Sequence, residues 1–254
     1  MQEPKEFIQM LECNHTLPDG QDERFNGYGV MGVPFTSGDL LALRRFPNTS
    51  IGDGYTSVWH RRPDGRWIFV QDAPPRYACS RYFGSAVDWV LEQEIRIEWD
   101  GPRRFTVHVD GDYPIRWEVS LGSGAGSQAM NMAAEWIPER WWRNRRLLDA
   151  FGKAGGLLMG SGRINLTGTV PNGQRFTSNP KIIWPVASSR AAVCGRQLGP
   201  TGPLPVQAHL ADVWLPQNGR FFAGNVYMEP FDPVRHSSAL LRSTDNDGEN
   251  LCWA

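Results

Sequence analysis

The sequence predicts a mainly β protein: an antiparallel barrel, closed or nearly closed, or a sandwich, with one helical insertion near residues 123–160. Apolar and polar residues alternate with a period of two along short segments on both sides of the insertion. Five Asp-Gly or Asn-Gly pairs, beginning at 64, 100, 110, 172 and 218, separate such segments and are typical of tight turns. Closure is attractive because it removes exposed sheet edges.

The clearest element is a three-stranded meander within residues 91–121. Residues 95–99, 105–110 and 115–121 each alternate apolar with polar side chains, which predicts one dry face and one wet face. His108 falls on the wet face, among charged residues that we expect to form solvated cross-strand ion pairs.

A second hairpin is predicted for residues 55–62 and 66–72, around Pro63-Asp64-Gly65. Its register pairs His60 with Ile68 and Val58 with Val70. One face holds Thr56, Val58, His60, Ile68, Val70 and Asp72, and the other holds Tyr55, Ser57, Trp59, Trp67, Phe69 and Gln71. Because both faces are largely apolar, we expect this hairpin to be covered on both sides.

The remaining elements have weaker signals. We predict a short helix near 7–11, strands at 28–35, 39–46, 77–83, 163–170, 174–186, 189–195, 209–215 and 221–228, and helices at 127–137 and 138–159. Pro138 suits the first turn of the second helix, and the glycines after residue 151 allow close packing. These elements predict an N-terminal segment (1–27), one β-barrel domain (28–229) and a mobile tail (230–254).

Composition excludes several classes of function. A net charge of −1 gives no electrostatic basis for binding nucleic acid, and no apolar run is long enough for stable membrane insertion. The N-terminus is acidic and polar, unlike a signal peptide, so we expect a cytoplasmic protein. Cys13, Cys79, Cys194 and Cys252 lie far apart without zinc-ligand spacing, so we predict buried free thiols and neither a metal nor a cofactor.

Eleven tryptophans favour either a large aromatic core or the wall of a cavity for a hydrophobic small molecule. We expect the ligand-binding residues to be Tyr55, Trp59, Trp67, Arg81, Tyr82, Trp117 and Trp141. Arg81 could hold a carboxylate or phenolate, or pair with an acidic neighbour.

His60 is the candidate catalytic residue. It lies on an aliphatic face with Val58, Ile68 and Val70, where burial would lower its pKa and keep the imidazole neutral, able to exchange protons with a ligand. The alternative is a hydrogen-bonded core histidine. Asp72 shares this face but is too far along the partner strand for direct contact.

Residues 39–67 (DLLALRRFPNTSIGDGYTSVWHRRPDGRW), the RYF at 81–83 and residues 95–110 (IRIEWDGPRRFTVHVD) resemble the lipocalin-like group that contains the bacterial carotenoid 1,2-hydratases. The resemblance covers roughly residues 39–120. It implies a β-barrel that receives a hydrophobic ligand, with acid-assisted hydration or cyclisation in some relatives. A fainter likeness, in the PNGQRF hairpin and residues 204–212, is to acetoacetate-decarboxylase-like barrels. The chain has only three lysines, Lys5, Lys153 and Lys181, in contexts that argue against Schiff-base chemistry.

We therefore predict a barrel that binds a hydrophobic small molecule. An enzyme is one form of this prediction, a lyase or isomerase of secondary metabolism acting on a polyene, polyketide or terpenoid. The first alternative is a non-catalytic protein that binds lipid or a membrane surface through the Trp- and Arg-rich residues 136–146. The second is an acetoacetate-decarboxylase-like barrel without the Schiff-base lysine. The sequence leaves the oligomeric state open, with a homodimer as one option.

Overall fold

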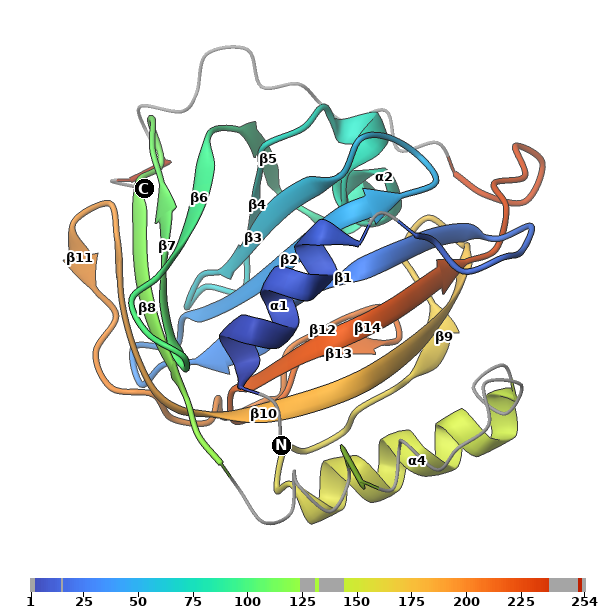
Figure 1. The fold of residues 1–254 in the computed structure, drawn as a ribbon. Helices are drawn as coiled ribbons and strands as arrows, with labels where there is room; N and C mark the ends of the chain where they lie inside the picture. Colours follow the sequence, from blue (N-terminus) through green and yellow to red (C-terminus); the bar gives the residue numbers. More distant parts are fainter. Residues whose placement is uncertain (1–2, 15, 124–130, 133–143, 238–250, 253–254) are drawn as a thin grey trace.

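The computed structural model describes residues 3–14, 16–123, 131–132, 144–237 and 251–252. The chain forms one large curled sheet, a small hairpin and a few helices (Figure 1). The large sheet consists of β1 (Glu23–Pro34), β2 (Leu40–Thr49), β3 (Tyr55–Arg61), β4 (Trp67–Gln71), β5 (Trp89–Glu92), β6 (Ile95–Trp99), β7 (Arg104–Val109), β8 (Ile115–Leu121), β9 (Thr167–Thr169), β10 (Arg175–Val193), β11 (Arg196–Gln197) and β14 (Arg220–Met228). The hairpin is β12 (His209–Leu210) with β13 (Val213–Trp214), and the helices are α1 (Pro4–Cys13), α2 (Ser80–Phe83), α4 (Arg145–Leu158) and two 3-10 turns, η1 (Pro75–Tyr77) and η2 (Gly84–Ala86).

The prediction of a mainly β fold is confirmed, but the barrel is open. The strand order is β5-β4-β3-β2-β1-β14-β10-β8-β7-β6, with β9 and β11 attached to β10. The end strands β5 and β6 follow each other in the chain, separated only by Gln93 and Glu94. Because the chain runs on from one edge strand into the other without a turn, no ladder joins them in the described chain. The sheet curls without closing, and its β4–β5 pair is parallel.

The concave side of the curl, called here the inner face, holds the main core. Apolar side chains of β1–β4 meet those of the meander β6–β8 there, and Trp117, Phe105 and Phe221 are fully buried in it. Helix α1 lies across β1 and β2 (Figure 1) and inserts Ile8 into the same core. The short N-terminal helix was therefore predicted correctly. Side chains fill the space that a hollow barrel would leave for a ligand.

The meander β6–β8 and the β3–β4 hairpin match their predictions. The register pairs His60 with Ile68 and Val58 with Val70, and Gly65 has a positive φ of 93° at the turn. Both faces of β3 and β4 are buried, as expected from their two apolar faces. His108 lies 3.6 Å from a carboxylate oxygen of Glu98 on the exposed face of the meander.

The strand predictions are wrong for residues 77–83, for the division of residues 174–195 into two strands, and for residues 209–215, which form the β12–β13 hairpin. Residues 77–83 form η1 and α2 instead of a strand, because Pro75 occupies the first turn of η1 and the chain then coils back, so that Ser80 Oγ donates to Gln71 Oε1 at 2.8 Å. The predicted strands 174–186 and 189–195 are one strand, β10. Register shifts near Pro180 and Val186 let β10 pair first with β14 and then with β8, so the apparent breaks in pattern are bulges.

The helical insertion is present, but its described helix begins later than predicted. The Asn144 side chain accepts hydrogen bonds from the backbone N–H groups of Arg146 and Leu147, which starts α4 at Arg145. Pro138 and most of the predicted helix 127–137 lie outside the described residues. Gly152 and Gly156 allow the close packing expected of them: a Cβ at Gly156 would lie 2.3 Å from the carbonyl oxygen of Gly162.

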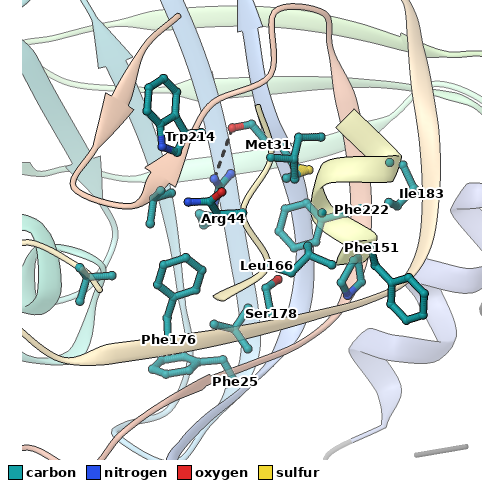
Figure 2. Close-up of a pocket in the computed structure, with 18 of the residues that line it drawn as sticks. Phe25, Met31, Arg44, Phe151, Leu166, Phe176, Ser178, Ile183, Trp214 and Phe222 are labelled. Carbon is teal, nitrogen blue, oxygen red and sulfur yellow. Dashed lines mark hydrogen bonds between the residues drawn. The ribbon is translucent and has the colours of Figure 1, made fainter. Parts of the chain in front are cut away.

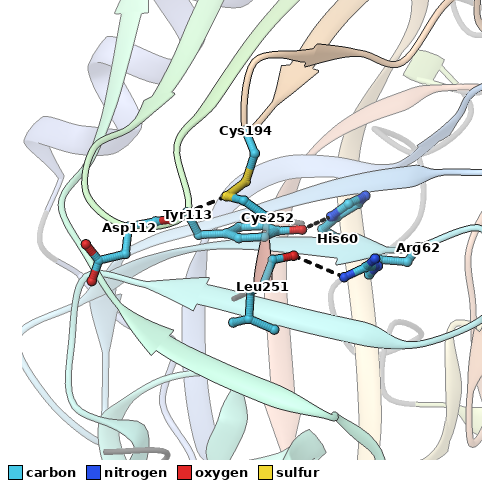
Figure 3. The surroundings of a disulfide bond; sticks show 7 residues. All are labelled: His60, Arg62, Asp112, Tyr113, Cys194, Leu251 and Cys252. Atoms are coloured by element: carbon cyan, nitrogen blue, oxygen red, sulfur yellow. Dashed lines mark hydrogen bonds between the residues drawn. A yellow bond between two sulfur atoms is a disulfide. The ribbon is translucent and has the colours of Figure 1, made fainter. Parts of the chain in front are cut away.

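The prediction of four free thiols is wrong for one pair. Cys194 forms a disulfide with Cys252, 58 residues away (Figure 3). Cys79 is free and buried as expected, whereas Cys13 is free and exposed. Leu251, from the segment expected to be a mobile tail, is buried in the inner-face core. No helix in the described part of the chain is both long and apolar enough to span a membrane.

Candidate functional site

The candidate site lies on the outer face of the sheet, opposite the inner-face core. It is a cavity of about 270 Å³ between β1–β3, β10 and β14 on one side and α4 with the β12–β13 hairpin on the other. Figure 2 shows Phe25, Phe176 and Phe222 of the sheet facing Phe151 of α4 across this space. The ligand space is therefore on the outside of the curl, under the helical insertion.

Strand alternation decides which side chains reach the cavity. In β3, Tyr55 and Trp59 point to the outer face because Val58 and His60 point to the inner face. Trp59 stacks on Phe69 with ring centroids 4.4 Å apart, which holds the indole against the sheet. Tyr55 and Trp59 are thus two of the aromatic residues that form the wall of the cavity.

Arg44 is the charged residue in this wall. Its Nη1 donates to the carbonyl oxygens of Val30 (2.6 Å) and Leu43 (2.8 Å), and its Nη2 donates to that of Met31 (3.3 Å). Among the described residues no carboxylate forms an ion pair with it. Burial lowers the pKa of Arg44 from 12.5 to about 10, so the guanidinium remains charged at neutral pH.

Tyr55 and Cys79 are two further polar residues of the wall, which also contains Asn131, Asn165 and Ser178. The Tyr55 hydroxyl lies 3.3 Å from the Cys79 sulfur. Burial raises the pKa of both groups, and the nearby Arg44 charge opposes that rise. Both groups are therefore protonated at neutral pH, and this thiol is not an activated nucleophile.

The predicted ligand-binding residues separate into three groups. Tyr55, Trp59 and Tyr82 line the cavity. Trp67 and Trp117 are buried elsewhere, the latter on the inner face, where its Nε1 donates to Ser189 Oγ at 2.7 Å. Trp141 lies outside the described residues.

Arg81 pairs with an acidic neighbour, which was one of its two expected roles. Its Nη2 lies 2.7 Å from Glu23 Oε1, and the Tyr82 hydroxyl donates to Glu23 Oε2 at 2.6 Å. Glu23 thus binds both residues without itself lining the cavity.

His60 lies on the inner face in a buried hydrogen-bond network. Its Nε2 is 2.8 Å from Asp39 Oδ1, and its Nδ1 is 2.7 Å from the Tyr113 hydroxyl. Because a carboxylate only accepts, Nε2 carries the proton, and in the neutral imidazole Nδ1 accepts from Tyr113. Burial lowers the pKa of His60, and Asp39 opposes that effect.

Asp39 has a second partner. The Arg196 guanidinium binds it through Nη1 at 3.1 Å and Nη2 at 2.9 Å. Burial by itself would raise the pKa of Asp39, but the hydrogen bonds from His60 and Arg196 hold it far below its usual range. Every buried polar group of this network has a partner, which matches the core-histidine alternative for His60.

Arg44 and Asp39 were not among the site residues predicted from the sequence. In β2 the outer-face positions Leu40, Ala42 and Phe46 are apolar, and Arg44 is the charged exception among them. The sequence did contain a signal for Arg44: a charged residue in a strand whose neighbours two positions away on either side are apolar. Among the described residues no group of His, Cys, Asp or Glu side chains has the arrangement of a metal site.

Comparison with known proteins identifies no family. No family model matches, and no curated protein matches the sequence. Among solved structures, the fold is similar to an acetoacetate decarboxylase from Legionella pneumophila, with 11% identity over 86% of this chain and 88% of that chain and a TM-score of 0.39. The resemblance of residues 39–120 to the carotenoid hydratase group stays a prediction.

Proposed function

We propose that this protein binds a small, predominantly apolar organic molecule in the outer-face cavity. The observation that supports this is a cavity of about 270 Å³ with a wall made largely of aromatic and aliphatic side chains. Protein interiors are close-packed, so a space of this size lined by rings such as those of Phe151 and Phe222 is the expected form of a ligand site.

The volume limits the size of the ligand. Sites for drug-sized molecules occupy roughly 300–1,000 Å³, so this cavity fits a molecule at or below the lower end of that range. A single-ring aromatic compound or a medium-chain aliphatic compound is of suitable size, whereas a full-length carotenoid is not.

The proposal does not use His60 as a catalyst. His60 and the cavity lie on opposite faces of β3, so a ligand in the cavity would not contact the imidazole. Hydration, cyclisation or isomerisation remains a separate hypothesis, which His60→Gln would test. Binding to anionic liposomes would instead support the membrane-surface alternative.

Filling the cavity tests the proposal. Ser178 of β10 lies in the cavity wall (Figure 2), so Ser178→Phe should occupy part of the space. Ser120→Phe, on the polar face of β8 and away from the cavity, is the matched control. A ligand at 100 times its dissociation constant should stabilise the wild type and the control by about 2.7 kcal/mol.

The measurements are native mass spectrometry of freshly purified protein and thermal unfolding with a panel of apolar compounds. Ser178→Phe should lose both the retained mass and the thermal shift. If the wild type shows no retained ligand and no shift with any compound, or if Ser178→Phe responds like the control, the proposal is wrong.

A further inference from the structure

The Arg44 guanidinium is only partly satisfied by the protein. A guanidinium has five N–H groups, and three of them donate to the carbonyl oxygens of Val30, Leu43 and Met31. Within the described chain no acceptor is in place for the other two, on Nε and Nη2. The accessible part of Arg44 faces the cavity, because the side chain is otherwise enclosed by the sheet.

Two aromatic rings hold the guanidinium in place. Its central carbon lies 4.6 Å from the ring centroid of Trp59 and 5.4 Å from that of Phe222. Together with the three carbonyl acceptors, these rings fix the plane of the cation before any ligand arrives. A pre-oriented fork of N–H donors is the geometry that recognises a carboxylate with two hydrogen bonds.

Several side chains near Arg44 carry donors as well. Tyr55 and Cys79 are protonated, and the Trp59 indole N–H and the Ser57 hydroxyl are buried beside the Cys79 thiol, with Ser57 directly across the β2–β3 ladder from Arg44. The described wall therefore offers one cation and several donors but no carboxylate. Burying an isolated cation costs several kcal/mol unless an anion accompanies it.

We propose that the ligand of this cavity is an apolar carboxylic acid whose carboxylate pairs with Arg44, with its hydrocarbon part against Phe25, Phe151 and Phe176. This inference rests on the proposed function and adds the chemical class of the ligand. A carboxylate suits the site, because its two oxygens match the two free N–H groups of the guanidinium.

Matched pairs of probes test the inference. We would measure binding of 4-phenylbutyrate against 4-phenylbutanol, and of octanoate against octanamide, by calorimetry at pH 7. Each pair has nearly the same apolar part, so the ratio of affinities reports the contribution of the charge. The wild type should prefer each acid at least tenfold, which a hydrogen-bonded charge pair readily provides.

Arg44→Gln removes the charge and keeps N–H donors for the backbone carbonyls. It should abolish the preference for acids, so that each acid and its neutral counterpart bind with about the same affinity. Arg45→Gln is the matched control, because Arg45 is the next residue of β2, points to the other face and pairs with Glu12 at 3.1 Å. The control should keep the full preference.

The outcomes separate the two proposals. If the wild type binds the neutral probes and the acids equally, the cavity is a binding site and the inference about Arg44 is wrong. The same conclusion follows if Arg44→Gln retains the preference. If no probe binds the wild type, both proposals fail. Should Arg44→Gln not fold, the wild-type ratio and Arg44→Lys, expected to retain part of the preference, still decide the matter.

Discussion

The buried carboxylate of Asp39 offers the sharpest test of the inner-face network. Asp39→Asn keeps the shape of the side chain but removes its charge and replaces one acceptor oxygen by an NH₂ donor. The amide oxygen in the place of Oδ1 can still accept from His60, whereas the NH₂ group in the place of Oδ2 then faces the Nη1 donor of Arg196.

The expected loss of stability follows from the burial of the partners. Removing one member of a buried charged pair costs about 3–5 kcal/mol, because the remaining groups stay desolvated. Asp39 and His60 are fully buried, but the Arg196 side chain is 52% exposed and can regain water. The loss should therefore be near the lower limit, about 3 kcal/mol.

The assay is urea unfolding at pH 7, followed by tryptophan fluorescence. With a slope of about 3 kcal/mol/M, a loss of about 3 kcal/mol lowers the midpoint by about 1 M. Asp110→Asn is the control, because its pair with Arg96 (2.7 Å) is about half exposed, and solvent screening leaves it little effect on stability. If Asp39→Asn costs no more than Asp110→Asn, the network does not stabilise the fold as argued.

Two further predictions concern the same end of the molecule. Cys252→Ser opens a disulfide that closes a 58-residue loop and should lower the free energy of unfolding by about 4 kcal/mol, whereas Cys13→Ser should change it by less than about 0.5 kcal/mol; equal urea midpoints for the two variants would refute this. The folded-state pKa of His60 is lowered, so the unfolded chain takes up this proton first, and stability should fall as the pH drops below about 6.5. The depressed pKa of Asp39 adds a further loss below about pH 3.9. Urea midpoints between pH 8 and 3 should show both losses, and His60→Gln should flatten the limb between pH 7 and 5; a wild type that gains stability between pH 7 and 5 would contradict the sign.

The local pattern of residues was sufficient to predict the structure where residues close together in the sequence determine it. The alternation in residues 95–121 and the Pro63-Asp64-Gly65 turn specify strand, face and register within a few residues. The pairing of Leu41 with His60 in the β2–β3 ladder also places Asp39 beside His60, so this contact was within reach of the sequence once the two strands had been paired.

Only the tertiary structure decided which face of the sheet became the core and which holds the cavity. Both faces of the β3–β4 hairpin are apolar. The alternation of residues alone therefore cannot distinguish the side that packs on the meander from the side beneath α4. The same holds for contacts between distant segments: Tyr113 and Arg196 reach the His60 network, and Cys252 reaches Cys194, from strands and loops far along the chain. The spacing of residues in the sequence carries no information about such contacts. They depend on how strongly the sheet curls, which decides which distant segments meet although the two edge strands do not pair.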